Sequence, residues 1–125
     1  LDANLVFARE AQVYLLEIEH LTKEGHSRMT STYEFYLSGI ETSLSRNKFI
    51  VSDCLSIADI SYVCDFAQFL REGHYLETIT QKGFELISDN LSREYPLALK
   101  HLLDLSEYEE FSSVMGSYLN WYKRN

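Results

Sequence analysis

Apolar residues recur along this chain at intervals of three and four positions, the spacing that places them on one face of an α-helix. Residues 3–22 carry two such stripes, Leu5, Ala8, Ala11, Leu15 and Ile18 in one and Phe7, Ala11, Tyr14, Ile18 and Leu21 in the other. Together they form a wide apolar arc, which predicts a first helix that contacts more than one neighbour. Asp2 is a suitable N-cap for this helix, and Gly25 is expected to end it.

A second helix is predicted from about Arg28 to Ser45, because apolar side chains keep the helical spacing throughout this segment. They are Met29, Tyr33, Tyr36, Leu37, Ile40 and Leu44. Ser31 and Glu34 have the spacing of a capping box, in which two side chains bond each other's backbone amides at a helix start. Asn47 is expected to end this helix.

A third helix is predicted over about 57–72, before Gly73, and it is apolar on nearly every side. Such a helix is expected in a central, enclosed position. Asp65 is the exception in this segment. We expect it either at an exposed edge or bonded to a neighbouring helix, and alternatively facing a cleft.

The rest of the chain also favours helices. Residues 74–94 indicate helical pieces interrupted at Gly83, and Pro96 suits the first position of a further helix because it has no N–H to leave unpaired. Ser106 and Glu109 form one more capping box, which predicts a last helix carrying Tyr108, Phe111, Met115, Tyr118 and Tyr122. The pattern therefore predicts an all-α, single-domain bundle of about five to six helices over residues 1–125.

Ser56 is followed three residues later by Asp59, just before the apolar run of the third helix. The Ser56 hydroxyl can accept a hydrogen bond from the amide of Asp59, and the Asp59 carboxylate can accept one from the amide of Ser56. A buried helix start leaves four amides without partners, and this pair satisfies two of them. We therefore predict a structural N-capping box at Ser56 and Asp59.

The residues around this capping box resemble the segment before the central helix in the all-helical C-terminal domain of glutathione S-transferases. The match comprises Phe49, Ile50, Val51, Asp53, Leu55, Ser56, Ala58 and Asp59, with Ser52 where the family commonly has glycine. Further on, Tyr95-Pro96 followed by Leu99, Leu102 and Leu103 looks like the Tyr/Phe-Pro opening of a later helix in that domain. The resemblance spans most of the chain and implies a glutathione S-transferase C-terminal-like bundle.

The resemblance also implies where substrate would bind. In that family the first helix of the all-α domain lines the electrophile pocket and also faces the partner subunit. The matching positions here include Phe7, Glu10, Ala11 and Tyr14, which mix aromatic surface with polar tips as small-molecule clefts do. The alternative is that Phe7 and Tyr14 are plain core or dimer contacts.

Family members activate the thiol of glutathione in an N-terminal thioredoxin-like domain, which needs βαβ patterns and a cis-Pro motif. Residues 1–125 have neither, so we expect no catalytic residue and no cofactor in this chain, with glutathione as the cosubstrate of a complete protein. The chain would then be the helical half of a homodimeric transferase that binds hydrophobic electrophiles. The alternative is a non-catalytic interaction module, as similar domains occur in translation elongation factor complexes, aminoacyl-tRNA synthetase assemblies and stress-response regulators.

Composition and charge limit the kinds of binding partner that we expect. The net charge is −8, and no cluster of basic residues is longer than Lys123-Arg124, so no nucleic-acid partner is expected. No run of about 18 apolar residues is present and the first residues resemble no signal peptide, so we expect no membrane span and a cytoplasmic protein. Cys54 and Cys64 have apolar neighbours, which predicts small buried hydrophobes in a reducing compartment.

Metal chemistry has little support in the sequence. Glu17 and His20 form one Glu-x-x-His unit, the half-motif of a di-iron bundle, but no second copy exists. No Cys or His pair has zinc-ligand spacing. We therefore expect no metal site.

Overall fold

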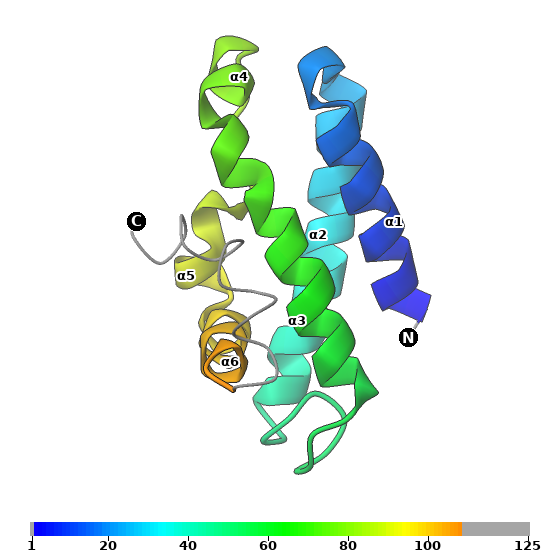
Figure 1. Cartoon of the computed structure of the whole chain (residues 1–125), viewed down its shortest axis with the longest axis vertical. Coiled ribbons are helices and arrows are strands. Elements are labelled where there is room, and N and C mark those ends of the chain that lie inside the picture. Colours follow the sequence, from blue (N-terminus) through cyan, green and yellow to red (C-terminus); the bar gives the residue numbers. More distant parts are fainter. Residues whose placement is uncertain (1, 109–125) are drawn as a thin grey trace.

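The computed structural model describes residues 2–108, and over this range the chain forms a bundle of helices without a strand (Figure 1). The α-helices are α1 (Asp2–Leu16), α2 (Lys23–Leu44), α3 (Ile57–Phe69), α4 (Leu76–Gln81), α5 (Leu91–Glu94) and α6 (Pro96–Ser106). Short 3-10 turns lie between them: η1 (Ile18–His20), η2 (Leu70–Tyr75) and η3 (Ile87–Asn90). The predicted all-α bundle is therefore confirmed for this part of the chain.

Helix α3 lies between two groups of helices. α1 packs against α2 and α3, and α6 packs against the same two helices. Figure 1 shows α1 on one side of α3 and the α5–α6 segment on the other. The loop between α2 and α3 extends past one end of the bundle, whereas α4 lies at the opposite end.

Aromatic side chains from the first three α-helices form the centre of the core. Phe7 stacks on Tyr36 with 4.6 Å between ring centroids, and it meets Phe69 edge-on at 5.5 Å. Tyr62 and Phe66 stack at 5.4 Å. Paired rings gain stability beyond the burial of their surface, so this cluster fixes the positions of α1, α2 and α3 relative to one another.

Helix α6 begins at Pro96, as predicted, but another helix caps its first free amides. The carboxylate of Glu41, on α2, accepts hydrogen bonds from the amide of Leu97 at 3.0 Å and from that of Ala98 at 2.9 Å. The Tyr62 hydroxyl of α3 donates to the carbonyl of Ala98 at 2.6 Å. Side chains from two neighbouring helices thus hold the beginning of α6.

The boundary between the first two helices differs from the prediction. α1 ends at Leu16 rather than near Gly25, and α2 begins directly after Thr22, whose hydroxyl accepts a hydrogen bond from the amide of Gly25 at 3.0 Å. Ser31 and Glu34 therefore lie inside α2, and the capping box predicted for them is wrong. The first turns of α2 carry polar residues, so the spacing of apolar residues could not reveal them.

One side of α3 is exposed, although the sequence predicts an enclosed helix. Ile57 and Ile60 face solvent, while the buried side carries Tyr62, Val63, Phe66, Ala67 and Phe69. Cys54 and Cys64 are exposed as well, so the prediction that they are buried is wrong. Their apolar neighbours belong partly to the loop before α3 and to its outer side, which the bundle leaves uncovered.

The segment after α3 follows the predicted division. Helical pieces lie on both sides of Gly83, the position at which an interruption is expected. Gly83 has φ +85°, a backbone conformation that residues with a side chain rarely adopt. From Glu109 onward the last predicted helix lies outside the described residues. Ser106, expected at its start, is the final residue of α6, and Tyr108 is exposed beyond that end.

Two glycines allow a paired test of these backbone assignments, because an added Cβ would meet no atom within 4 Å at either one. We expect Gly83→Ala to lower the free energy of unfolding by about 1 kcal/mol, since alanine is strained at positive φ. Gly39→Ala, in the middle of α2, should instead raise it by up to about 1 kcal/mol through helix propensity. Urea denaturation measures both, and changes of the same sign would contradict the assignment.

Candidate functional site

Asp59 is fully buried near the start of α3, and its carboxylate accepts hydrogen bonds from three segments of the chain. Oδ2 accepts from the amide of Ser56 at 2.9 Å and from its hydroxyl at 3.2 Å. Oδ1 accepts from the amide of Ile50 at 3.0 Å and faces Nε2 of His101 at 2.8 Å. The Ser56 hydroxyl in turn caps the first turn of α3, so the predicted capping box is confirmed.

The surroundings of Asp59 determine its charge. Burial by itself would raise the pKa of this carboxyl, but the amide of Ile50, the ring of His101 and the amide of Ser56 together outweigh burial and lower the pKa of Asp59. Asp59 is therefore ionised at neutral pH. Because an ionised carboxylate can only accept, Nε2 of His101 carries the proton of their hydrogen bond.

His101 is a residue of this site that sequence reasoning missed. It occupies the buried face of α6 with Leu102 and Leu105, and its ring packs against Phe49 and Tyr62 at centroid distances of 5.8 Å and 6.1 Å. A histidine in the middle of an apolar helical stripe was the available signal. The pattern could not name its partner, which lies 42 positions earlier in the chain.

The four residues predicted to bind substrate share one side of α1, as expected, and three of them lie in the core. Phe7, Ala11 and Tyr14 are at most 5% exposed. Glu10 lies at the edge of this face, where its carboxylate bonds the guanidinium of Arg28 on α2 at 2.8 Å. Their role in substrate binding stays a prediction.

A cleft of about 430 Å³ lies between α1 and the beginning of α2. Two of the predicted residues, Glu10 and Tyr14, line it together with the apolar side chains of Val13 and Met29. Arg28 stands on the α2 side of the cleft. Charged and polar side chains, among them Arg9, Glu17 and His20, make up most of the lining, so apolar surface is the smaller part of these walls.

Glu72 is a second fully buried carboxyl group, and sequence reasoning missed it too. Oε2 accepts from the hydroxyl of Tyr14 at 2.6 Å and from the amide of Ile87 at 2.9 Å. Oε1 accepts from the amide of Ser88 at 3.1 Å and from its hydroxyl at 2.9 Å. One side chain of η2 therefore joins α1 to η3, and its position three residues after the buried Phe69 was the available signal.

Tyr14 and Glu72 affect each other's protonation. Burial raises the pKa of Glu72, and the hydrogen bonds from Tyr14, Ile87 and Ser88 offset this only in part. Burial, followed by the charge and the hydrogen bond of Glu72, raises the pKa of Tyr14. Tyr14 consequently keeps its proton and acts as a donor to Glu72.

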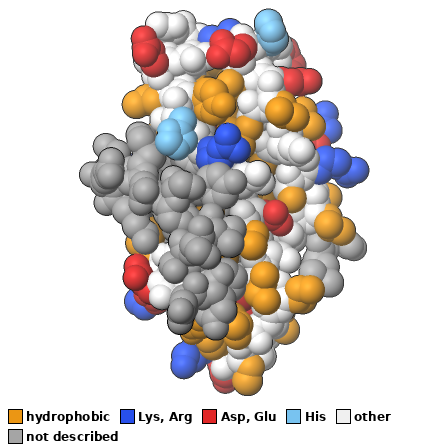
Figure 2. Space-filling model, in the orientation of Figure 1, with side chains coloured by type: hydrophobic (Ala, Val, Ile, Leu, Met, Phe, Trp, Pro, Cys, Tyr) orange, Lys and Arg blue, Asp and Glu red, His pale blue; other side chains and the backbone are white. Residues whose placement is uncertain are grey.

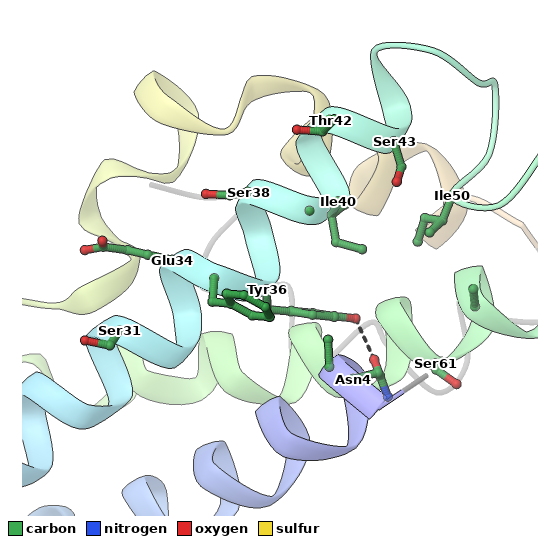
Figure 3. A pocket seen from close by; sticks show the side chains of 14 residues that line it. Asn4, Ser31, Glu34, Tyr36, Ser38, Ile40, Thr42, Ser43, Ile50 and Ser61 are labelled. Carbon is green, nitrogen blue, oxygen red and sulfur yellow. Dashed lines mark hydrogen bonds between the residues drawn. The ribbon is translucent and has the colours of Figure 1, made fainter.

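A larger groove, of about 780 Å³, lies between the beginning of α1, the middle of α2 and the beginning of α3 (Figure 3). Ile40 of α2 and Ile50 of the loop point toward each other across it. At one end the Tyr36 hydroxyl donates to Oδ1 of Asn4 at 2.5 Å, and Nδ2 of Asn4 donates to Asp65 at 2.9 Å. The latter bond confirms the prediction that Asp65 bonds a neighbouring helix.

Other kinds of site have no support in the part of the chain that the structure describes. Within residues 2–108, no three side chains of the types His, Cys, Asp or Glu converge where they could hold a metal ion. Among the helices of that range, none combines the length and the apolar character needed to cross a membrane. Comparison of the chain with protein-family models, curated proteins and solved structures gives no match.

The first prediction for this site concerns Asp59. Asp59→Ala should lower the free energy of unfolding by about 3 kcal/mol, since it removes a cap and leaves buried donors unpaired, whereas Ser56→Ala should cost about 1 kcal/mol. Because the folded-state pKa of Asp59 lies below 3.8, its stabilising effect is complete above that pH and is lost as the pH falls through the lowered value. Urea denaturation at several pH values tests this, and an equal or smaller loss for Asp59→Ala would contradict it.

Glu72 should show the opposite pH dependence. Its pKa is raised above 4.5 by folding, so the folded protein holds this proton more tightly than the unfolded chain, and stability falls as the pH rises through the raised value. Between about pH 4 and about pH 8, the free energy of unfolding of the wild type should fall relative to that of Glu72→Gln. Glu77→Gln, at an exposed position on α4, is the control, and parallel curves for wild type and Glu72→Gln would contradict the assignment.

Proposed function

We propose that this chain is the helical, substrate-binding half of a glutathione S-transferase-like protein. The capping box at Ser56 and Asp59 carries this proposal, because it is the motif through which the sequence resembles that family. The box forms at the start of α3 in an all-helical bundle, with Asp59 fully buried, and this arrangement supports the proposal.

The cleft between α1 and α2 supports the assignment of a site for hydrophobic electrophiles. Val13 offers apolar surface, and Glu10 and Tyr14 are two of the four positions that the resemblance relates to substrate binding. The outer side of α1 is then the surface for the second subunit of a homodimer. Glutathione would be held and activated by the thioredoxin-like half, so the helical half contributes binding rather than catalysis.

A second candidate function, a non-catalytic interaction module, is favoured by the outer surface of α1. Leu5 and Leu16 are 66% and 77% exposed, a large fraction for leucine side chains on one helix. Figure 2 shows hydrophobic side chains on this face of the molecule toward the side where α1 lies. Apolar surface of this kind marks protein-interaction sites as readily as it marks a subunit contact.

Conjugation of glutathione to 1-chloro-2,4-dinitrobenzene distinguishes the two functions. We expect the protein encoded by the complete reading frame to catalyse it and residues 1–125 alone to lack the activity. Val13→Trp, which fills the cleft, should raise KM for the electrophile at least about fivefold with little change in KM for glutathione, because only one substrate uses this wall. Ser27→Trp, at an exposed position of α2 outside the cleft, is the control.

The transferase proposal fails if the complete, folded protein conjugates none of a panel of electrophiles. The proposed electrophile site is also wrong if Val13→Trp and Ser27→Trp have equal effects on KM. In the first case the interaction module remains, and Leu16→Asp should then abolish an assembly seen by analytical ultracentrifugation without lowering the melting temperature.

A further inference from the structure

The groove between α1, α2 and α3 is distinct from the cleft of the proposed function. The two spaces share no lining residue: the cleft takes its walls from residues 9–29, whereas the groove takes them from residues 3–4 and 31–61. A volume of about 780 Å³ suits a small organic molecule. The walls come from three helices and a loop that Asp59 holds in place through the amide of Ile50, so the groove is a fixed feature of the bundle.

At Gly39 the groove reaches the backbone of α2, because glycine has no side chain. It lines the groove, and a Cβ built there would meet no atom within 4 Å. Glycine inside a long helix is destabilising relative to alanine, and no contact in the described bundle requires it at this position. The absent side chain leaves room for an occupant against the helix in this groove, which Ile40 and Ile50 also line.

The polar end of the groove presents hydrogen-bond acceptors. The Tyr36 hydroxyl donates its proton to Oδ1 of Asn4. The phenolic oxygen can therefore still accept a hydrogen bond, and Oδ1 of Asn4 can accept a second one. Asp65 accepts the bond from Asn4 directly behind them. Burial, followed by the charge of Asp65, raises the pKa of Tyr36, so this hydroxyl keeps its proton and remains the donor to Asn4. A ligand group that donates hydrogen bonds matches this end.

The charges around the groove have one sign. Glu34 is the charged residue among those that line it, and neither lysine, arginine nor histidine is among them. The carboxylate of Asp65 behind Asn4 adds a second negative charge to this side of the bundle. An anionic ligand would therefore be repelled, whereas an ammonium group both donates hydrogen bonds and complements the charge.

From this geometry we propose that the groove is a binding site for small amines with an apolar body. The apolar part lies over Gly39 between Ile40 and Ile50, and the amino group donates to the oxygens of Tyr36 and Asn4. This site is independent of glutathione conjugation and makes no use of the cleft at Val13.

Three probes of similar size test the proposal: 2-phenylethylamine, 2-phenylethanol and phenylacetate. In titrations followed by 1H–15N NMR at neutral pH, the amine should shift the amides of Gly39, Ile50 and Ser61, the alcohol should bind more weakly, and phenylacetate should leave these amides unmoved. Gly39→Leu fills the groove with a good helix former and should weaken amine binding at least about tenfold. Ser27→Leu, at an exposed position of α2 outside the groove, should leave it unchanged.

Each remaining outcome overturns the proposal. Absence of shifts with all three probes at millimolar concentration would mean that the groove binds none of them. Equal or tighter binding of phenylacetate would remove the charge selectivity, and equal affinities of the Gly39→Leu and Ser27→Leu variants would place the amine elsewhere. If the groove amides shift with protein concentration alone, and sedimentation gives a doubled mass, a second copy of the chain is the occupant.

Discussion

One buried, ionised carboxylate, that of Asp59, determines how the bundle is assembled at the end where the loop between α2 and α3 lies. Burying a carboxylate away from solvent is strongly unfavourable unless the carboxylate accepts hydrogen bonds. Asp59 accepts them from the loop, from the start of α3 and from α6. Ser56 at the start of α3 supplies the donors for Oδ2, whereas Oδ1 takes its donors from Ile50 in the loop and His101 on α6. The loop, α3 and α6 must therefore take their places together, and the groove walls contributed by Ile50 and Ala58 follow from that arrangement.

Glu72 performs a comparable structural task beyond the other end of α3, with different chemistry. Its four donors are hydroxyls and amides, whereas Asp59 also has a histidine as partner. Burial outweighs the donors in the pKa of Glu72, whereas the donors to Asp59, led by the amide of Ile50 and then by His101, outweigh burial. Two carboxyls with no exposed surface thus respond to pH in opposite directions. Tyr14, the donor to Glu72, also lines the cleft, so this cluster supports one wall of the proposed electrophile site.

The parts of this structure that the sequence could predict are those in which both partners lie within about one helical turn. The capping box at Ser56 and Asp59 is of this kind, and so is Pro96 at the first position of α6. The start of α2 was predicted too late because Thr22 precedes polar turns that carry no apolar signal. For the long-range bonds, a local signal marked at most one partner and never the pair. His101 and Asp59 are 42 positions apart, and Tyr14 and Glu72 are 58 apart, so neither pairing can be inferred from spacing.

The same reasoning applies to the candidate sites. Helical periodicity correctly placed Phe7, Ala11 and Tyr14 on one side of α1, but periodicity cannot tell whether that side meets a ligand or other helices. The groove at Gly39 has walls from segments far apart in the chain. Its presence depends on how α1, α2 and α3 are spaced, which the aromatic core sets and which no single segment encodes.

The cap that Glu41 provides for α6 has a consequence for how this protein folds. A helix that begins with its own serine or aspartate can form transiently in an isolated peptide, whereas α6 receives its cap from a residue 56 positions away. Its first turn gains that stabilisation only after α2 has formed and the two segments have met, so ordering of α6 is a late event that depends on docking. Such dependence links α2 with the last described helix, and a fragment ending before Pro96 would leave the carboxylate of Glu41 without its two backbone donors.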